Sequence, residues 1–228
     1  MTSLVDSVLR RASETQPPRI AVLVPCYNEA TTIGRVVADF AQALPDARIY
    51  VYDNNSTDGT AAAAAAAGAI VRNETRQGKG NVVRRMFADI DADVYVMVDG
   101  DHTYDAASAP ALVDRLWKGR YDMVNGARVT TLGASTRPGH AFGNWLLSSL
   151  VRCFFGTGTR DMLSGFKVFS RRYVKSFPAL SSGFEVETEL VIHALEMRMP
   201  ITEIDTLYRD RPPGSASKLR TVSDGLRI

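Results

Sequence analysis

The sequence predicts an α/β fold in which helices sandwich a mainly parallel sheet. Short apolar segments alternate along the chain with segments whose apolar residues recur at helical spacing. The apolar segments are continuous, which is typical of parallel strands buried on both faces. With 228 residues, 45% of them hydrophobic, the chain is long enough to bury the core of one large domain.

The expected elements follow one another in this alternating order. The first apolar segment, 19–25, ends at Pro25, and a helical pattern follows over 28–44. Further strands are expected at 48–53, 69–73, 94–99 and 121–126, each with a helical segment before or after it. Seven consecutive alanines, 61–67, predict a helix that packs closely on the sheet.

The domain organisation expected is a short N-terminal arm, 1–18, followed by one domain, 19–228. Pro17 and Pro18 separate the two parts, and the segment "DRPPGSAS" predicts a flexible, exposed loop around 208–220. The N-terminus lacks the sustained apolar core of a signal peptide. No stretch approaches the roughly 18 uncharged apolar residues of a spanning helix, so a soluble chain is expected.

Charge and cysteine content exclude some classes of function. The chain has 27 basic and 25 acidic residues, a net charge of +2, so no global field favours nucleic acid and any attraction for anions must be local. Cys26 and Cys153 lack the number and spacing of a disulfide framework or a zinc site. We therefore expect a reducing compartment and no nucleic-acid partner.

Unusual polar residues collect where the predicted strands end. In parallel sheets, ligands bind beyond the carboxyl ends of the strands. There the chain has "PCYNE" at 25–29, "DNNSTDGT" at 53–60 and "DGD" at 99–101. We expect Asp53, Asp99 and Asp101 to share one rim of the sheet.

Asp99 and Asp101 stand one residue apart. Side chains two apart on an extended segment point to the same side, and Gly100 allows a tight turn or the close approach of a ligand. Mg²⁺ and Mn²⁺ accept such oxygens and share them with substrate phosphates. The pair predicts a metal–diphosphate site, with an ordinary acidic turn as the alternative.

The prediction of a metal–diphosphate site is supported by a series of motifs that occur in a fixed order along the chain. The motifs are "VLVPCYNEATTIG", "DNNSTDGT", "GKGNVVRRMF", "DGDHTYD", "RDMLSGFKVFSR", "FEVETEL" and "RPPGSASKLR". Over about 19–220 the chain resembles the family-2 glycosyltransferases, and among them the polyprenyl-phosphate, dolichyl-phosphate mannose synthase-like enzymes. The resemblance implies the GT-A fold, which is Rossmann-like.

The sequence departs from the family at two points. Asn54 stands where members more usually have a second acidic residue, which leaves the choice of nucleobase open. The membrane helices that follow the catalytic domain in many members do not follow Ile228. The second departure indicates a naturally short member or a shortened chain.

The resemblance implies a donor site and a metal site at the sheet rim. Asp101 corresponds to the main ligand of Mg²⁺ or Mn²⁺, and Asp99 faces the metal or the ribose. The residues implied in nucleotide-sugar binding are Pro25, Tyr27, Glu29, Asp53, Lys79, Asp99 and Gly100. Structural alternatives remain, because Asn28 and Glu29 can simply begin a helix, and Asp58 with Gly59 can form a plain turn.

Lys79 lies in "RQGKGNVVRRMF", before a helix whose N-terminus can attract anions. The segment is not a Walker A motif, because Asn73 and Gly80 stand where glycine and Ser or Thr are needed. Val83 likewise prevents a G-x-G-x-x-G match. The resemblance puts Lys79 beside the donor, and a solvated helix start is the alternative.

The helical segment 184–198 contains a carboxylate on its apolar side. Glu187 falls in the middle of the apolar face. A carboxylate directed inward is either paired with a cation or held in a cleft with a raised pKa, which makes Glu187 a candidate catalytic residue together with Asp101. Glu185 fits a capping box with Ser182, and His193, on the polar face, is expected at the surface.

A last group of residues points to the acceptor. Arg128, Arg137, Arg211 and Lys218 are each read singly as solvated charges. In the family, the corresponding residues gather on the acceptor side and resemble a grip for a lipid phosphate or the leaving diphosphate. Asp161 and Ser164 in "RDMLSGF" resemble the D-x-x-S-G-F motif near the acceptor, or only stabilise a turn. The apolar segment 140–155 is either a core helix or a helix at the membrane interface.

The function expected is that of an inverting glycosyltransferase, peripheral to the inner, cytoplasmic face of a membrane. It would move a sugar from a UDP- or GDP-sugar to a polyprenyl phosphate, of the undecaprenyl or dolichyl type, with transfer to a saccharide hydroxyl as an alternative. "VMVDGDHT" also fits the D-x-D-x-T signature of Mg²⁺-dependent haloacid-dehalogenase-type phosphatases, although three strand–helix units precede it here. A non-catalytic sugar-nucleotide-binding module is a third possibility.

Overall fold

The computed structural model describes residues 17–130, 149, 151 and 159–212. Arg137, Lys218, most of the segment 140–155 and residues 1–16 of the predicted arm lie outside the described residues. Within them the chain forms a seven-stranded sheet with the order β3-β2-β1-β4-β6-β5-β7. The strands are β1 (Ile20–Cys26), β2 (Arg48–Asp53), β3 (Ile70–Asn73), β4 (Val94–Met97), β5 (Met123–Thr130), β6 (Lys167–Ser170) and β7 (Ile201–Tyr208).

The sheet is parallel except at one strand. β3, β2, β1 and β4 pair in parallel, as do β5 and β7. β6 pairs antiparallel with both β4 and β5. Because β6 runs the other way, its amino end lies at the edge where the other strands have their carboxyl ends. The residues just before Lys167 are therefore brought to that same edge.

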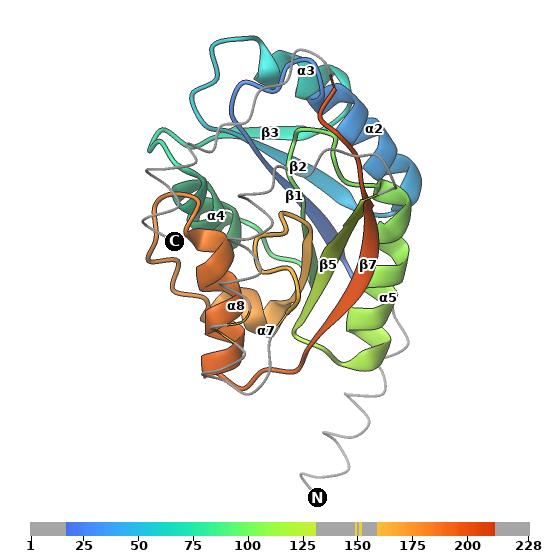
Figure 1. Cartoon of the computed structure of the whole chain (residues 1–228). Helices are drawn as coiled ribbons and strands as arrows, with labels where there is room; N and C mark the ends of the chain where they lie inside the picture. Colours follow the sequence, from blue (N-terminus) through green and yellow to red (C-terminus); the bar gives the residue numbers. More distant parts are fainter. Residues whose placement is uncertain (1–16, 131–148, 150, 152–158, 213–228) are drawn as a thin grey trace, which may run out of the picture.

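Helices cover both faces of the sheet (Figure 1). The described helices are α2 (Ile33–Ala43), α3 (Thr60–Ala66), α4 (Lys79–Asp89), the 3₁₀ helix η1 (Ala106–Ser108), α5 (Ala109–Gly119), α7 (Arg171–Ser176) and α8 (Val186–Glu196). β1 shows how they divide, because Val22 and Val24 join the core under α2 and α5 whereas Ala21 and Leu23 join the core under α4, α7 and α8. Alternate residues of a strand point to opposite faces, so the continuous apolar strands fill two cores.

The predicted sheet, mainly parallel and sandwiched by helices, is confirmed. The expected strands at 19–25, 48–53, 69–73, 94–99 and 121–126 correspond to β1 to β5, and the alanine segment forms α3, with Ala64 fully buried. The sequence analysis did not identify β6 and β7. Among the helices of the described part, none combines the length and apolar character needed to cross a membrane.

Two expectations for the segment 184–198 are wrong. Glu185 is itself the N-cap residue of α8, and no side-chain capping bond forms. The Ser182 carbonyl accepts a hydrogen bond from the Gly80 N–H at 3.0 Å. His193 is buried, 3.0 Å from the Ser176 hydroxyl, and its ring meets the Phe177 ring edge-on. α7 and the turn after it cover the side of α8 that the helical pattern assigns to solvent.

We predict that Gly80→Ala lowers the free energy of unfolding by about 1–3 kcal/mol, because an added Cβ would lie 2.2 Å from the Ser181 carbonyl oxygen. Gly34→Ala is a matched control, because each glycine is the second residue of its helix and the nearest atom to a Cβ on Gly34 is 4.0 Å away. That variant should be neutral or more stable by about 0.5–1 kcal/mol. Urea unfolding curves measure both, and equal effects would contradict the close packing of α4 on 181–183.

Candidate functional site

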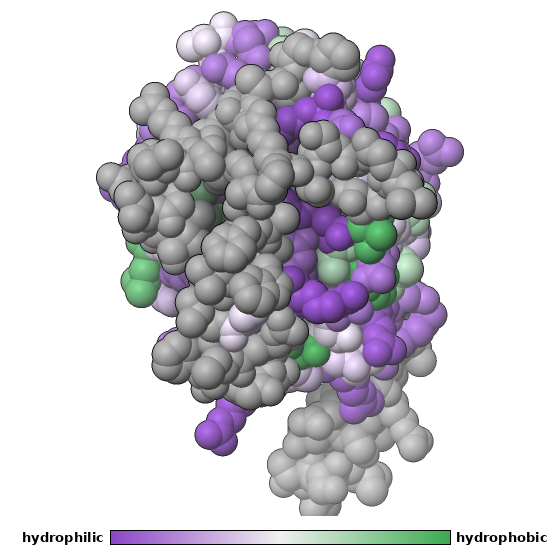
Figure 2. All heavy atoms as spheres, viewed as in Figure 1, coloured by the Kyte–Doolittle hydropathy of each residue, from purple (hydrophilic) through white to green (hydrophobic). Residues whose placement is uncertain are grey.

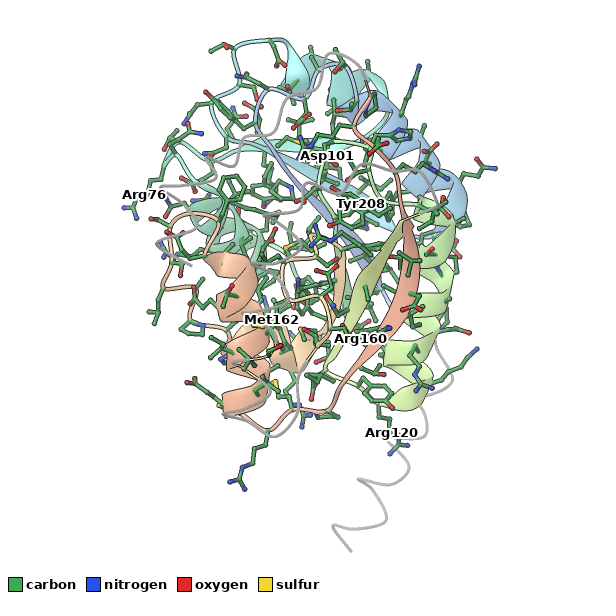
Figure 3. The ribbon with its side chains drawn as sticks, in the orientation of Figure 1. Arg76, Asp101, Arg120, Arg160, Met162 and Tyr208 are labelled. Carbon is green, nitrogen blue, oxygen red and sulfur yellow. The ribbon has the colours of Figure 1, made fainter. Side chains whose placement is uncertain are left out.

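The candidate site lies at the carboxyl ends of the parallel strands. In Figure 3, Asp101 lies at this end of the sheet near Tyr208, the last residue of β7, and Arg120 marks the opposite end. Burial raises the pKa of the Cys26 thiol at the end of β1, and the carboxylates of Glu29, Asp53, Asp99 and Asp101 raise it further. These four carboxylates therefore lie in the neighbourhood of the Cys26 thiol. Figure 2 shows mainly hydrophilic side chains among the described residues of this region.

The centre of the site is an ammonium group between two carboxylates. Lys79, the first residue of α4, places Nζ 2.5 Å from Asp99 Oδ1 and 2.5 Å from Glu187 Oε1. Asp99 follows β4, and Glu187 is the second residue of α8. One side chain thus joins three elements that are far apart in the sequence. The inward direction of Glu187, predicted from the helical pattern, is confirmed by its burial.

The ionisation of this group follows from its surroundings. Burial alone would lower the pKa of Lys79, but the carboxylates of Asp99 and Glu187 raise it above its ordinary value. Lys79 therefore stays protonated at neutral pH. The side chain is 9% exposed, so the alternative of a solvated helix start is wrong. An ammonium held by two carboxylates can bind a diphosphate or sugar oxygen only at its remaining N–H.

Asp101 is held from two sides. Its Oδ1 accepts hydrogen bonds from the N–H of Thr103 at 3.1 Å and from the Thr103 hydroxyl at 2.6 Å. Its Oδ2 lies 2.6 Å from Nη2 of Arg211. Burial and the neighbouring Asp99 raise the pKa of Asp101, although Arg211 and Thr103 oppose the shift. Arg211 is thus paired at the centre of the site rather than solvated.

Two glycines leave room for this arrangement. A Cβ on Gly100 would lie 2.6 Å from the Sγ of Cys26, so the glycine between the two aspartates permits close packing on β1. A Cβ on Gly165 would lie 2.0 Å from Asp99 Oδ2. The backbone at Gly165 is therefore the wall against which the Asp99 carboxylate rests.

The predicted nucleoside side of the site contains an unpaired carboxylate oxygen. Asp53 Oδ2 accepts from the Ser56 N–H at 3.1 Å, whereas Oδ1 is buried and has no hydrogen-bond partner among the described residues. Buried polar atoms without a partner are rare in folded proteins, so Oδ1 is available to a donor on a ligand. Glu29 is buried beside Thr32, Tyr27 is 39% exposed and Pro25 is half-buried.

Asn54 has a structural role that sequence reasoning missed. Its amide donates to the carbonyls of Glu74 and Arg76 at 2.7 and 2.8 Å, and its Oδ1 accepts from the Gly78 N–H at 2.7 Å. The amide thus holds the segment that leads into α4 and Lys79. An aspartate at this position could not donate those bonds.

Among the residues predicted on the acceptor side, Arg128 and Asp161 pair with each other, Ser164 stabilises a turn, and Arg211 reaches the candidate metal site. Arg128 Nε and Nη2 each lie 2.7 Å from a carboxylate oxygen of Asp161, and the guanidinium stacks over the Tyr208 ring. This pair lowers the pKa of Asp161 although burial opposes the shift. Ser164 donates to the Gly126 carbonyl at 2.6 Å and accepts from the Phe166 N–H, so it stabilises its turn. Of the described residues predicted on the acceptor side, Arg211 is the one paired with the Asp101 carboxylate.

The carboxylates fit a divalent cation that shares its ligands with a substrate. Asp99 and Asp101 supply hard oxygen donors, and each is already held by a cationic side chain, Lys79 or Arg211. In the described part of the chain, no group of three or more His, Cys, Asp or Glu residues could hold a metal ion. A metal at Asp99 and Asp101 would therefore take further ligands from phosphates and water, as Mg²⁺ and Mn²⁺ usually do.

Comparison with known proteins gives consistent similarities. The family model described as Glycosyl transferase family 2 matches residues 21–177. Glycosyltransferase AglJ of Haloferax volcanii is 37% identical over 212 residues, 92% of this chain and 69% of AglJ. A dolichyl-phosphate hexose transferase of the same organism is 30% identical over 210 residues, 92% of this chain and 90% of that protein.

Solved structures agree with these sequence similarities. Glucosyl-3-phosphoglycerate synthase of Mycobacterium tuberculosis matches with a TM-score of 0.73 and 25% identity, over 89% of this chain and 76% of the synthase chain. A complex of that synthase with Mn²⁺, uridine diphosphate and glucosyl-3-phosphoglycerate matches with a TM-score of 0.70 and 26% identity, over 88% and 75% of the two chains.

We predict that Lys79→Met lowers the free energy of unfolding by about 3–5 kcal/mol, because it leaves two carboxylates in a buried place without their cation. Lys118→Met is the control, since Lys118 pairs with Asp114 on an exposed helix face with its side chain 72% exposed. The control should change stability by less than about 1 kcal/mol. Urea unfolding at neutral pH measures both, and equal losses would contradict the central role of Lys79.

Proposed function

This chain belongs to glycosyl transferase family 2 and has a GT-A fold, and from that premise we propose that it transfers a sugar from a nucleoside-diphosphate sugar to a polyprenyl phosphate. The observation that carries the proposal is the group of opposite charges at the strand ends, where Asp99 pairs with Lys79 and Asp101 with Arg211. Such a group has the charges needed for a divalent cation and for phosphates on either side of it.

The donor is bound beyond β1 and β2. The unpartnered Oδ1 of Asp53 accepts an N–H of the nucleobase. Uracil and guanine each offer such an N–H, so both UDP- and GDP-sugars remain candidates, and UDP in the synthase complex supports the first. The half-exposed ring of Tyr27 offers an apolar face beside Pro25 and Glu29. Lys79 lies between this region and Glu187 and meets the diphosphate or the sugar.

A divalent cation, Mg²⁺ or Mn²⁺, is held by Asp99 and Asp101. When bound, it neutralises charge on the leaving nucleoside diphosphate. The Mn²⁺ in the synthase complex supports this assignment. Asp101 binds through an oxygen that Arg211 otherwise occupies, and Asp99 stays fixed against Gly165 and Lys79. Glu187 keeps Lys79 in place through their shared bond.

The acceptor is a lipid phosphate, which the name of one relative, a dolichyl-phosphate hexose transferase, supports. A phosphate monoester has a second pKa near 6 and is largely dianionic at neutral pH, so it needs cations to hold it more than a base to activate it. Guanidinium groups bind phosphates through paired hydrogen bonds. Arg211 suits this task, and Arg128, Arg137 and Lys218 are further candidates, while Asp161 and Ser164 shape the loop beside them.

The reaction balances as a single displacement. A phosphate oxygen of the acceptor forms a bond to the anomeric carbon of the sugar. The bond from that carbon to the diphosphate oxygen breaks, and its electron pair leaves with the nucleoside diphosphate, so the configuration inverts. A polyprenyl chain is poorly soluble in water, and we therefore propose a peripheral location on the inner, cytoplasmic face of a membrane.

The experiment incubates the chain and Mn²⁺ with labelled UDP- and GDP-sugars and three acceptors: a polyprenyl phosphate in detergent, a free saccharide and a small phosphorylated hydroxy acid. We expect label only in the lipid phosphate. Transfer to either hydroxyl acceptor at a comparable rate would overturn the acceptor assignment, and release of inorganic phosphate from the phosphorylated hydroxy acid would favour a phosphatase.

We predict that Asp101→Asn lowers turnover at least a hundredfold and abolishes Mn²⁺-dependent binding of the nucleotide, with the fold retained, because the change removes charge from the proposed metal ligand. Asp114→Asn, on an exposed helix face, is the control and should behave as wild type. Activity and thermal shift with UDP or GDP and Mn²⁺ measure the effects. Near-normal turnover in Asp101→Asn would contradict the metal assignment.

For the acceptor side, Arg211→Ala should raise the KM for polyprenyl phosphate about tenfold or more, the worth of a charge-assisted hydrogen bond. Mn²⁺ binding without acceptor should be no weaker, since Asp101 loses a competing cation. Arg209→Ala is the control, because the Arg209 guanidinium pairs with Asp105 rather than with Asp101. Steady-state kinetics measure the KM for polyprenyl phosphate, and a titration without acceptor measures Mn²⁺ binding. An unchanged acceptor KM in Arg211→Ala would show that another cation holds the phosphate.

A further inference from the structure

Lys167 is a buried cation that the proposed reaction does not use. It is the first residue of β6 and is fully buried. Its ammonium donates hydrogen bonds to two main-chain carbonyls, those of Met162 at 3.0 Å and of Ser164. Burial lowers the pKa of Lys167 to about 8, although the carboxylates of Glu187 and Asp161 oppose the shift. Burying an ammonium whose hydrogen bonds go to neutral carbonyls is costly.

The carbonyls that Lys167 holds belong to the segment 161–165. On β5, Asn125 stands directly opposite Lys167 in the strand register, and its amide donates to the Asp161 carbonyl at 2.9 Å. The two side chains together hold three carbonyls of this segment. In Figure 3, Met162 lies in the interior between α8 and the sheet. The segment 161–165 is therefore held by hydrogen bonds from side chains of two neighbouring strands, β5 and β6.

The far end of this segment touches the proposed metal ligand. The Gly165 N–H donates to the Tyr104 hydroxyl at 2.6 Å, and a Cβ on Gly165 would lie 2.0 Å from Asp99 Oδ2. Any shift of the segment toward the site would push the Asp99 carboxylate, and any shift away would remove its wall. Asp99 is thus bounded by Lys79 on one side and by Gly165 on the other.

We propose that Lys167 is a positioning residue that fixes the segment 161–165 and, through Gly165, the carboxylate of Asp99 in the geometry that binds the divalent cation. The inference rests on the proposed function for the identity of that cation. A neutral lysine amine still offers two N–H donors, one for each carbonyl. The positioning role therefore does not depend on the charge of Lys167.

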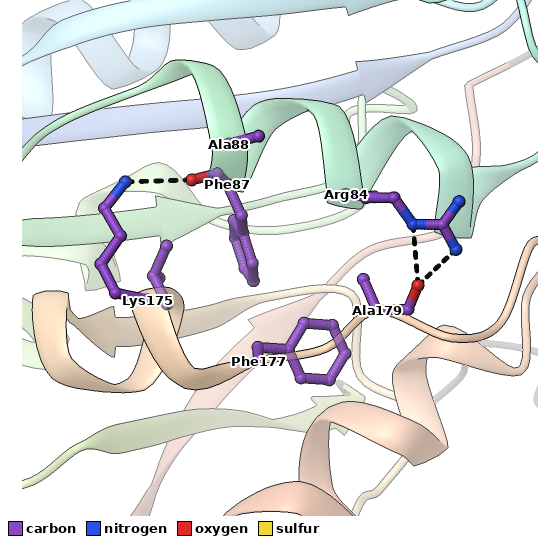
Figure 4. Close-up of a pocket in the computed structure, with 7 residues that line it drawn as sticks. Arg84, Phe87, Ala88, Lys175, Phe177 and Ala179 are labelled. Atoms are coloured by element: carbon purple, nitrogen blue, oxygen red, sulfur yellow. Dashed lines mark hydrogen bonds between the residues drawn. The ribbon is translucent and has the colours of Figure 1, made fainter.

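Lys175 offers a control that makes the same kind of hydrogen bonds, although Lys175 is exposed whereas Lys167 is buried. This lysine of α7 also donates to two main-chain carbonyls, those of Phe87 and Ile90, each at 3.1 Å. Figure 4 shows its bond to Phe87 at the edge of a cavity of ≈ 290 Å³ between α4 and α7. None of the residues that line this cavity belongs to the candidate site. Lys175 thus makes the same kind of bond as Lys167, but to carbonyls outside the segment 161–165.

The experiment compares Lys167→Met and Lys175→Met in the full chain. Stability is measured by urea unfolding, and the dissociation constant of Mn²⁺ in the presence of UDP is measured from the spin-resonance signal of free Mn²⁺. Lys167→Met should lose stability, because it leaves two buried carbonyls without their donor. Lys175→Met should lose less, because Lys175 is exposed and water can replace its hydrogen bonds. We expect Lys167→Met to raise the Mn²⁺ dissociation constant at least tenfold, and Lys175→Met to leave it within twofold of wild type.

A second variant keeps the test decisive if Lys167→Met does not fold. Gly165→Ala displaces the Asp99 carboxylate directly and should raise the same constant at least tenfold. A wild-type Mn²⁺ constant in folded Lys167→Met, or in Gly165→Ala, would overturn the inference while the proposed function stands. Failure of the wild-type chain to bind Mn²⁺ with either UDP or GDP would instead overturn the proposed metal site, and the inference with it.

Discussion

The site depends on one buried interaction, the ammonium of Lys79 held between the carboxylates of Asp99 and Glu187. Removing ions from water costs several kcal/mol for each ion, and only close pairing offsets that cost. The three residues come from α4, the end of β4 and α8, so these elements must meet for any of the charges to be satisfied. Glycines at 78 and 80 let the start of α4 approach the carbonyls of 181–183, which sets this meeting point.

Further pairs of opposite charge lie around the Lys79 group. Asp101 faces Arg211, Asp161 faces Arg128, and Lys167 lies near both Asp161 and Glu187. A site balanced in this way gains little net charge when a divalent cation and a diphosphate enter together, whereas either ligand alone would leave an uncompensated charge. The charge pattern therefore favours the two ligands as a pair, which agrees with a donor that binds with its metal.

The sequence predicts those features that depend on local pattern. The continuous apolar strands predict the parallel sheet, and the helical period predicts the inward direction of Glu187. The partner of Glu187 is 108 residues away, and no local rule identifies Lys79 as its counter-charge. His193 was assigned to solvent because the helical wheel does not include α7, whose Ser176 and Tyr173 cover it. Arg128 and Asp161, predicted as separate acceptor residues, are partners across two segments.

Glycines explain why the sequence motif alone did not predict how Asp99 and Asp101 are packed. The motif with Asp99 and Asp101 is visible in the sequence, but the space for it is made by residues without side chains. Gly100 admits the sulfur of Cys26, and Gly165, from a loop more than sixty residues away in the sequence, admits the Asp99 carboxylate. His102 adopts a left-handed backbone conformation, with φ at 60°, while its ring bonds to Asp39. Such a conformation costs of order 1–3 kcal/mol and persists only where surrounding contacts hold it. The two aspartates are thus fixed by different parts of the fold, Asp101 by its own turn and by Arg211, and Asp99 by α4 and the loop before β6. The distance between their oxygens therefore depends on how these parts pack together.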